Sequence, residues 1–549
     1  MSNNKTPAEE LTARYAQFGG ILSVAERCFA DGNLDASARL AQMAARRAFP
    51  HHIGVFASPR LERLLLNIGK RAASRSGPTS RRSDAGVRKV LHVLTYARPI
   101  GGDTRFVWRW IQLDRQSQHS VVITAQNELE HLFSVPESLK DAVARSGGFL
   151  RALAAPSSNP LEKAGELREL CQGMDMVILH LYPHDIVPVL ALATGCDFVR
   201  VAFANLSDHT FWLGGSVSDL IVHLRSQSPD FLVSRRGLTR VTPAILPIPL
   251  ETHCSAMTSA EAKHSLGYAP DKVVLLTIAS PFKYKSLGDD AFLDLVTPIL
   301  QESPQAVLLA VGPDPKGDWQ AASLLAGGRI KALGTRWDNA SLYAAADVYL
   351  DSVPFSSITS LLEAGNLGIP LLSNVSPNPD LTLLGPGAPG LDGAMEITKD
   401  AEDYRLRLRR LINDSEFRQR CGQRVREDIL AAHAETNWAS SVTAIYERLE
   451  QSSGDKCLAA ENDEFCSGPL DLTLTHLYDW ADRRSFRHEI QDSLGDLSYA
   501  SRLSVLRHLF RNGFQPHWRN LLPLPLDKVL RCLGGYVRSI APRSQSSFS

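Results

Sequence analysis

The chain has 549 residues, more than one hydrophobic core normally organises, so roughly two to four domains are expected. Hydrophobic residues make up 44% and charged residues 21%, as in ordinary globular proteins, and 59 Lys and Arg balance 59 Asp and Glu. This balance gives no overall field that would favour nucleic acid or an anionic membrane surface as a partner.

The cysteines and the hydropathy pattern indicate a reducing compartment. The eight cysteines are scattered, with no CxxC pair and no His/Cys cluster at zinc spacing, which favours free thiols. The N-terminal segment MSNNKTPAEELTARYAQFGG is polar where a signal peptide needs an apolar core. No apolar run reaches the roughly 18 residues of a membrane span. We therefore expect a cytoplasmic protein without a transmembrane segment.

Residues 1–75 are predicted to be helical. In the segment Ala25–Pro50, small and apolar residues recur at helical spacing on both sides of a turn at Gly32 and Asn33. This pair of helices resembles one tetratricopeptide-type hairpin, in which alanines let two helices cross closely. A plain helical hairpin without a peptide-binding role fits the same residues. Because a single hairpin cannot bury its own apolar face, we expect it to pack on another part of the chain.

A linker over 76–86, rich in Ser, Arg and Gly, separates these helices from a region with a different pattern. Over 87–250, continuous apolar runs alternate with predicted helices, which is typical of a parallel sheet covered on both faces. The predicted strands of this region are Lys89–Thr95, Val121–Thr124, Met176–His180 and Val199–Phe203.

The same alternation returns after the proline-rich passage Leu246–Leu250 and continues over 251–450, where a helix containing Trp438 and Tyr446 is predicted to close the second half. Two Rossmann-like α/β lobes with a cleft between them are therefore predicted. A polar linker over 451–470 and a helical extension over 471–549 follow. The predicted strands of the second half are Val273–Ile278, Ala306–Val311, Ile330–Leu333, Val348–Leu350 and Pro370–Ser373.

The segment Ala344–Pro370 carries the clearest functional pattern. It is predicted to form a buried strand, a Pro/Ser turn and a helix that begins near Thr359 and Ser360. The hydroxyls of these two residues and the free N–H groups of a helix N-terminus suit a phosphate, although both could be plain capping residues. Glu363 lies one turn further on and can accept hydrogen bonds from a ribose diol. This combination predicts a nucleotide diphosphate at the carboxyl end of a parallel sheet.

Several segments together resemble bacterial GT-B-fold glycosyltransferases of the large "group 1" type, over roughly 87–450. They are VLHVLTYARPIGGDTRFVWRWIQLD, NLSDHTFWLGGSVSD, RRGL with ILPIPL, ASPFKYKSLG and YAAADVYLDSVPFSSITSLLEAGNLGIP. The resemblance implies an α/β protein of two Rossmann-like lobes (GT-B) with helical N- and C-terminal extensions. The helix entry is also similar to that of protein O-GlcNAc transferases, where a Thr-Thr pair binds the diphosphate and a carboxylate three residues later binds the ribose. Ser360 and Glu363 keep that spacing.

The chain departs from the family pattern at three places. Retaining members carry two glutamates eight residues apart, whereas Phe355 stands eight residues before Glu363. The family also pairs an arginine with a lysine, but small residues near Thr277–Ala279 occupy the expected arginine position. Asp103 stands in the Gly-Gly-Asp loop where His is expected in close relatives. The sequence therefore leaves the donor sugar and the stereochemical outcome open.

Sugar transfer needs a stabilised leaving diphosphate, an oriented acceptor and a group that takes the acceptor proton. Without a metal, cationic side chains and helix dipoles must neutralise the leaving group. Lys283 follows the strand Val273–Ile278 and is predicted to point into the cleft, with Lys285 as a second candidate. A solvated loop lysine is the alternative for each. No DxD-like pair follows a strand in a way that would hold Mg²⁺, so no metal is expected.

The first lobe offers a candidate base. Asp208 and His209 are predicted to follow the strand Val199–Phe203, and a histidine beside a carboxylate at a strand end can act as a general base. Structural capping is the alternative role of this pair. His180 and His184 end another predicted strand and are candidates for contact with the acceptor or the donor sugar.

The Gly-Gly loop of the first lobe offers further ligand contacts. Gly101 and Gly102 let the backbone approach a ligand closely, although a tight turn without a ligand fits them as well. Arg105, in the first turn of the next predicted helix, could reach a phosphate or the acceptor.

Together these residues predict a metal-independent, hexosyltransferase-type glycosyltransferase (EC 2.4) with a UDP- or GDP-linked sugar as co-substrate and no other cofactor. The acceptor could be a saccharide, a lipid-linked intermediate, a small molecule or a protein side chain, and the hairpin favours a protein slightly. No nucleic acid is expected as a partner, and a homodimer through the helical ends stays open.

Other protein classes fit the sequence less well. A catalytically silent GT-B scaffold that acts as a binding or assembly partner is the main alternative, and the three departures from the family pattern motivate it. An epimerase of the UDP-GlcNAc 2-epimerase type is a third hypothesis. The absence of GxGxxG and GxxxxGK[ST] gives no support to nicotinamide enzymes or P-loop NTPases.

Overall fold

The computed structural model of the protein describes residues 6–49, 51–73, 86–99, 101–126, 133–153, 159–196, 199–238, 244–250, 257–287, 291–336, 338–458, 460–478, 486–522 and 526. Residues 76–85 of the predicted linker 76–86 lie outside the described residues. So do all residues of the predicted extension after 522 except residue 526. Among the described residues, no helix is long and apolar enough to cross a membrane.

The first lobe is built on a sheet whose described part has seven parallel strands in the order β3-β2-β1-β4-β5-β6-β7. The prediction Met176–His180 coincides with β4, and the short strands β3, β6 and β7 are not among the predicted ones. The strands are β1 (Arg88–Leu94), β2 (Ser117–Ile123), β3 (Leu150–Ala152), β4 (Met176–His180), β5 (Arg200–Asn205), β6 (Leu220–His223) and β7 (Ala244–Ile245). The helices around them are α4 (Gly102–Leu113), α5 (Glu137–Arg145), α6 (Pro160–Cys171), α7 (Val187–Leu192) and α8 (Pro229–Arg236).

The second lobe repeats this architecture, and its sheet has six described parallel strands in the order β10-β9-β8-β11-β12-β13. The predictions for β8, β9 and β11 coincide with the observed strands. The strands are β8 (Val273–Ile278), β9 (Ala306–Val311), β10 (Ile330–Ala332), β11 (Val348–Leu350), β12 (Leu371–Asn374) and β13 (Glu396–Thr398). The helices of this part are α9 (Ser259–Ser265), α10 (Phe292–Glu302), α11 (Asp318–Leu325), α12 (Ala340–Ala345), α13 (Ile358–Asn366), α14 (Ala401–Asn413) and α15 (Ser415–His433).

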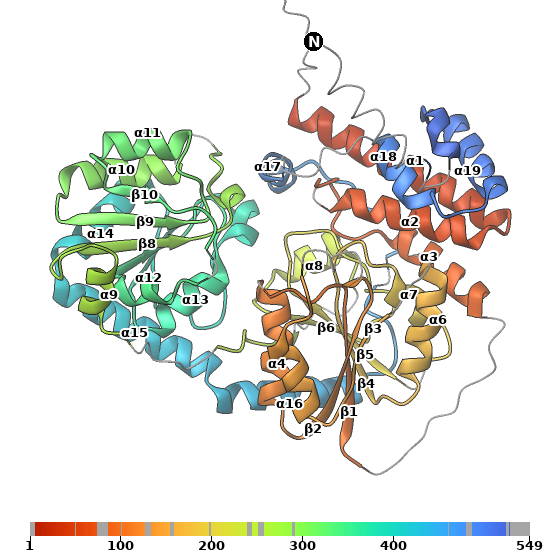
Figure 1. Cartoon of the computed structure of the whole chain (residues 1–549), viewed down its shortest axis with the longest axis horizontal. Coiled ribbons are helices and arrows are strands. Elements are labelled where there is room, and N and C mark those ends of the chain that lie inside the picture. The colour runs from red at the N-terminus through yellow and green to blue at the C-terminus, as the bar shows by residue number, and fades with distance from the viewer. Residues whose placement is uncertain are drawn as a thin grey trace, which may run out of the picture.

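The helices at the two ends of the chain pack together, most of them over the first lobe, while α17 (Pro469–Leu477) also contacts the second lobe (Figure 1). The N-terminal helices are α1 (Pro7–Ala30), α2 (Leu34–Ala48) and α3 (Pro59–Ala73), and the C-terminal ones are α17, α18 (Phe486–Leu494) and α19 (Tyr499–Arg511). Leu40 of α2, Ile490 of α18 and Val505 of α19 belong to one buried cluster that continues into the first lobe. This packing confirms that the predicted hairpin buries its apolar face on other parts of the chain.

Helix α16 (Glu435–Glu450) differs from its prediction, because it does not close the second lobe. Its buried residues Trp438, Val442 and Tyr446 pack in a cluster with strand and helix residues of the first lobe. Figure 1 shows α15 leaving the second lobe and α16 lying beside the first. The last helix of the repeated pattern therefore completes the core of the lobe that begins at β1.

The polar segment 451–470 also differs from a free linker. Its backbone is hydrogen-bonded to the first lobe, since Cys457 N–H donates to Ser218 O at 2.9 Å and Leu458 N–H donates to Gly215 O at 3.1 Å. Further along, the Ser58 hydroxyl donates to the Asp463 carboxylate at 2.8 Å. A polar composition without periodicity predicts a loop, but it carries no information about the surface on which the loop lies.

Gly69 marks a close crossing of the N-terminal helices with the first lobe. A Cβ atom at this position would lie 2.5 Å from Leu190 O, a backbone atom of α7 that has little room to move. We expect Gly69→Ala to lower the free energy of unfolding by about 1–3 kcal/mol through overpacking, as measured by thermal or chemical denaturation. The matched control is Gly165→Ala inside α6, where no atom lies within 4 Å of the added Cβ. There the higher helix propensity of alanine is expected to stabilise the protein by about 0.5–1 kcal/mol.

Candidate functional site

A cavity of about 450 Å³ lies between the two lobes, where strands of both sheets end. The carboxyl ends of parallel strands are where α/β proteins normally bind ligands. The wall takes residues from the N-terminal turns of α4 and α13, from the ends of β4 and β5, and from the short helix after β8. These residues include Gly102, Asp103, His180, Asn205, Lys283 and Thr359.

Lys283 brings a positive charge to the second-lobe side of this cavity. Its Nζ donates a hydrogen bond to Ser356 O at 2.8 Å and lies 4.6 Å from the ring centroid of Phe355. Burial lowers the pKa of Lys283 to about 8, against the opposing effect of the Asp351 carboxylate. Lys285 points elsewhere, because its Nζ donates to His476 O of α17 at 2.6 Å. The structure therefore places Lys283, and not Lys285, in the cavity wall.

Helix α13 begins at Ile358, as the pattern around Thr359 and Ser360 predicts. Thr359 lines the cavity, whereas Ser360 is absent from the described wall and its hydroxyl lies 3.4 Å from that of Ser357. A Cβ atom at Gly102 would lie 3.5 Å from the Thr359 hydroxyl oxygen. The first turns of α4 and α13, one from each lobe, therefore meet at the same side of the cavity.

Glu363 and Arg105, predicted separately as ligand contacts, contact each other across the two lobes. Arg105 Nη1 of α4 donates to Glu363 Oε1 of α13 at 2.5 Å. The other carboxylate oxygen of Glu363 accepts from the Tyr343 hydroxyl at 3.1 Å. Neither residue is among those described as lining the cavity, and the two side chains are 32% and 28% exposed, so the pair is accessible to solvent.

The Gly-Gly loop leads directly into a polar cluster on the first-lobe side. Gly101 has φ of 130°, and a Cβ atom there would lie 2.5 Å from Asp103 Oδ1, so this position requires glycine. The Asp103 carboxylate accepts from Arg98 Nη2 at 3.0 Å and from the Tyr182 hydroxyl at 3.1 Å. Asp103, at the position where His is expected in close relatives, therefore orients Arg98 and Tyr182 in the cavity wall.

The predicted base pair, Asp208 and His209, does not line this cavity. The Arg225 guanidinium binds the Asp208 carboxylate through two nitrogens and holds the pKa of that carboxyl well below its usual range, although burial alone would raise it. The His209 ring lies 4.6 Å from the Phe355 ring centroid and borders a void of only about 10 Å³. Burial lowers the pKa of His209. The arrangement fits the structural role that the sequence leaves open for this pair.

His180 and His184 also separate in the structure. His180 at the end of β4 lines the cavity and is 5% exposed. His184 is not among the residues described as lining the cavity, and its Nε2 lies 3.0 Å from the Tyr96 hydroxyl. Burial lowers the pKa of each imidazole to about 3.

Five buried polar atoms of the cavity wall have no hydrogen-bond partner among the described residues. They are Arg98 Nε, Asp103 Oδ1, His180 Nδ1, Asn205 Oδ1 and Trp212 Nε1. Buried polar groups are nearly always paired in native proteins, so bound water or a ligand is expected to satisfy these atoms. The sequence pattern assigned no role to Arg98, Asn205 or Trp212, although Arg98 lies within the segment VLHVLTYARPIGGDTRFVWRWIQLD and the other two within NLSDHTFWLGGSVSD.

Within the described part of the chain, no group of three His, Cys, Asp or Glu side chains is placed to hold a metal ion.

No protein-family model matches the chain, and no curated protein matches its sequence. Solved structures do match its fold. Anabaena HepE, crystallised in complex with UDP, superposes with a TM-score of 0.50 and 14% identity over 65% of this chain and 99% of its own. An O-GlcNAc transferase mutant from Thermobaculum terrenum gives a TM-score of 0.47 and 16% identity over 79% and 84% of the two chains. A glycosyltransferase from Rickettsia africae superposes with a TM-score of 0.48 and 11% identity, over 67% of this chain and 100% of its own.

Of these three superpositions, the one with HepE is close enough to bear on the fold. Together with the two parallel sheets, it shows that the chain has the two-lobe GT-B fold with helical extensions at both ends. At 14% identity the likeness concerns the fold and not the chemistry.

Proposed function

We propose that the protein is a glycosyltransferase that moves a hexosyl group from a nucleotide-diphosphate sugar to an acceptor hydroxyl bound in the interlobe cavity. The five unpartnered polar atoms of the cavity wall carry this proposal. They include acceptors and donors, and a polyhydroxylated ligand can satisfy both because each hydroxyl donates one hydrogen bond and accepts others. The GT-B fold shared with HepE, whose structure contains UDP, favours a UDP-linked donor.

The leaving diphosphate fits the side of the cavity where the two lobes approach. The first turns of α4 and α13 supply free backbone N–H groups and the positive ends of two helix dipoles. Lys283 adds a cationic side chain, and the Thr359 hydroxyl adds a neutral donor. These groups can stabilise a diphosphate without a metal ion, which is the mode of catalysis that we propose.

Glu363 is proposed to bind the ribose diol. Its Oε1 would exchange the Arg105 guanidinium for ribose hydroxyls, while Tyr343 continues to hold Oε2. Arg105, once released, lies beside the same nucleotide and can pair with a phosphate. The two residues would thus change partners together when the donor binds.

Nucleotide binding tests the proposal directly. We expect UDP or a UDP-sugar, added without metal at about 100 times its dissociation constant, to stabilise the protein by about 2.7 kcal/mol and to raise its melting temperature by several degrees. Glu363→Ala removes the proposed ribose ligand and is expected to weaken UDP binding about 10- to 100-fold, because a hydrogen bond to a charged group contributes about 1.5–3 kcal/mol. A thermal-shift titration with UDP, GDP, dTDP and CMP measures both effects.

Lys285→Ala is the matched control for this titration, since Lys285 donates to His476 O outside the cavity wall and should not affect UDP affinity. The absence of a shift with every nucleotide and nucleotide sugar would contradict the proposal and favour the scaffold alternative. A shift that Glu363→Ala leaves unchanged would contradict the assignment of Glu363 alone.

A further inference from the structure

Three histidines form a continuous hydrogen-bonded row across the first-lobe sheet. His92 of β1 lies between His180 of β4 and His119 of β2, with His92 Nδ1 3.0 Å from His180 Nε2 and His92 Nε2 3.0 Å from His119 Nδ1. Leu94 pairs with His180 and Val90 pairs with His119, so the three side chains lie on one face at registers two residues apart. The row therefore crosses the sheet diagonally. At one end of the row, His180, the last residue of β4, lines the interlobe cavity.

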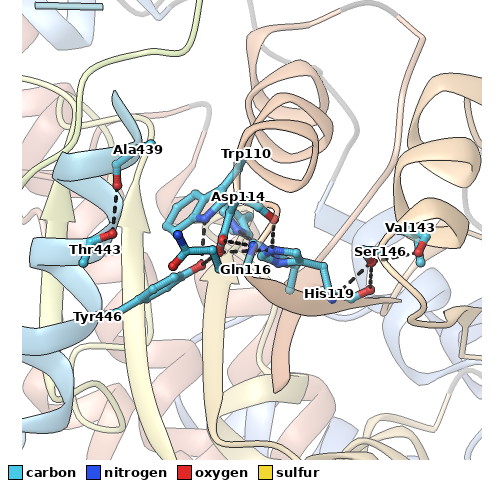
Figure 2. Close-up of polar contacts among 11 residues, drawn as sticks. Trp110, Asp114, Gln116, His119, Val143, Ser146, Ala439, Thr443 and Tyr446 are labelled. Atoms are coloured by element: carbon cyan, nitrogen blue, oxygen red, sulfur yellow. Dashed lines mark hydrogen bonds and ion pairs between the residues drawn. The ribbon is translucent and has the colours of Figure 1, made fainter. Parts of the chain in front are cut away.

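Asp114, which lies just before the amino end of β2, ends the row beside His119 (Figure 2 shows these two residues). It follows α4, and one of its carboxylate oxygens lies 3.2 Å from His119 Nε2 and accepts from the Tyr446 hydroxyl at 2.9 Å. Trp110 Nε1 in turn donates to the Tyr446 oxygen at 2.9 Å. Asp114 is 9% exposed and precedes two exposed residues, Arg115 and Gln116, so this end of the row lies just beneath the surface.

The oxygens around His119 fix the proton positions of the entire row. Its Nε2 faces the Asp114 carboxylate and also lies 3.2 Å from Asp114 O, and an ionised carboxylate and a backbone carbonyl accept but do not donate. His119 must therefore carry its proton on Nε2 and accept from His92 at Nδ1. His92 therefore carries its proton on Nε2, and its Nδ1 accepts a hydrogen bond from Nε2 of His180. Because the proton of His180 is on Nε2, its Nδ1 keeps a free lone pair. This atom is buried and has no hydrogen-bond partner among the described residues, and His180 itself lines the cavity.

We propose that His180 is the general base of the transfer reaction and that His92, His119 and Asp114 set its tautomer and carry the proton away. This inference rests on the proposed function. Nδ1 of His180 takes the acceptor's hydroxyl proton as the acceptor oxygen bonds to the anomeric carbon. The bond from that carbon to the diphosphate breaks, and its electron pair leaves with the diphosphate. The Nε2 proton of His180 passes to His92, and the Nε2 proton of His92 passes to Nδ1 of His119.

The row explains how a deeply buried histidine can serve as a base. Burial lowers the pKa of His180 to about 3, so a proton that stayed on this ring would be held poorly. Through the row, the proton reaches His119, whose Nε2 lies 3.2 Å from a carboxylate oxygen of Asp114. Burial alone would raise the pKa of Asp114, but the contacts with His119 and the Tyr446 hydroxyl lower it to about 2, so the carboxylate stays ionised at neutral pH. His180 is the catalytic residue of this scheme, and the other three are positioning residues.

The tautomer of His180 can be measured without substrate. In protein labelled with ¹⁵N-histidine, the His180 ring signals are those lost in His180→Asn. We expect ¹⁵N–¹H correlation spectra to show an unprotonated Nδ1 and a protonated Nε2 for His180. A protonated Nδ1, or an equal mixture of the two tautomers, would overturn the proposal whether or not the protein is a glycosyltransferase.

His119→Asn separates the proton carrier from the tautomer. The asparagine oxygen can still accept from His92 Nε2, so the tautomer of His180 and the UDP thermal shift are expected to persist. The new side chain cannot carry a proton, and turnover of the UDP-sugar selected by the thermal-shift screen should fall about 100-fold or more. His180→Asn should cause a similar loss. If His119→Asn does not fold, His180→Asn alone carries the kinetic test.

The controls distinguish failure of this inference from failure of the proposed function. His433→Asn removes a buried histidine of α15, which contacts backbone oxygens of Ile248 and Pro389, and should change turnover less than tenfold. Failure of the wild-type protein to bind any nucleotide or nucleotide sugar would refute the proposed function itself. Normal UDP binding with near-wild-type turnover in His180→Asn or His119→Asn would refute the base and the row while leaving the proposed function standing.

Discussion

Replacing Glu62 by alanine is expected to lower the free energy of unfolding by about 3 kcal/mol or more, the largest stability effect that we predict. Glu62 of α3 is 1% exposed and accepts hydrogen bonds from the backbone N–H groups of Gly214 at 2.6 Å, Gly215 at 3.1 Å and Ser216 at 3.2 Å. Without the carboxylate these three donors lose their partner at the contact between α3 and the first lobe. Each unsatisfied buried donor costs about 1–3 kcal/mol.

Denaturation monitored by circular dichroism, together with limited proteolysis after α3, measures the effect of Glu62→Ala. Glu26→Ala is the matched control. Glu26 of α1 pairs with Arg60 of α3, the helix that also carries Glu62, and the two side chains are 39% and 35% exposed. Such a surface pair contributes less than about 1 kcal/mol. Equal losses for the two variants would contradict the role assigned to Glu62.

Replacing Lys283 by methionine is expected to lower turnover of the nucleotide sugar about 100- to 1,000-fold, the range found when one preorganised donor to a developing charge is removed. Lys283 is the lysine that lines the cavity, and its ammonium group would face the charge that develops on the leaving diphosphate. Methionine keeps the length and apolar character of the stem but removes the charge. Steady-state kinetics should show the loss mainly in kcat, because the charge develops in the transition state.

The pH dependence of turnover provides an independent check on Lys283. Burial lowers the pKa of Lys283 to about 8, so the cationic form predominates at pH 7 and is lost as the pH rises through 8. Turnover of the wild-type protein should therefore fall above about pH 8, while Lys283→Arg should move this decline to higher pH because arginine stays charged. A Lys283→Met variant that binds UDP and keeps more than a tenth of the wild-type kcat would contradict the assignment.

The sequence predicts the central strands and the elements of the site that lie within one stretch of chain. Continuous apolar runs mark β4, β8, β9 and β11 with their observed bounds, because both faces of these strands are buried. The start of α13 near Thr359 follows from turn and helix residues that are neighbours in sequence. The strands β3, β7 and β13 have only two or three residues each, too few to show a hydrophobic periodicity in the sequence.

Contacts between distant segments account for most of what the sequence does not predict. The pairing of Arg105 with Glu363 joins residues 258 positions apart and depends on how the lobes face each other. His209 looks like a base at a strand end, but Phe355 of the other lobe and Tyr478 beyond α17 lie against its ring. The histidine row has a faint local signal, a histidine inside the apolar run of β1, but its partners lie 27 and 88 positions away.

The packing of the two chain ends against each other has a consequence for synthesis on the ribosome. Helices α1 and α2 bury their apolar surface partly against α18 and α19, which are translated about 440 residues later. At about 5–20 residues per second, that interval lasts roughly 20–90 s. The first lobe also waits, for a shorter interval, because α16 supplies part of its core. The nascent chain therefore exposes apolar helix surface during most of its translation, and chaperone binding to the N-terminal helices should persist until the C-terminal ones emerge.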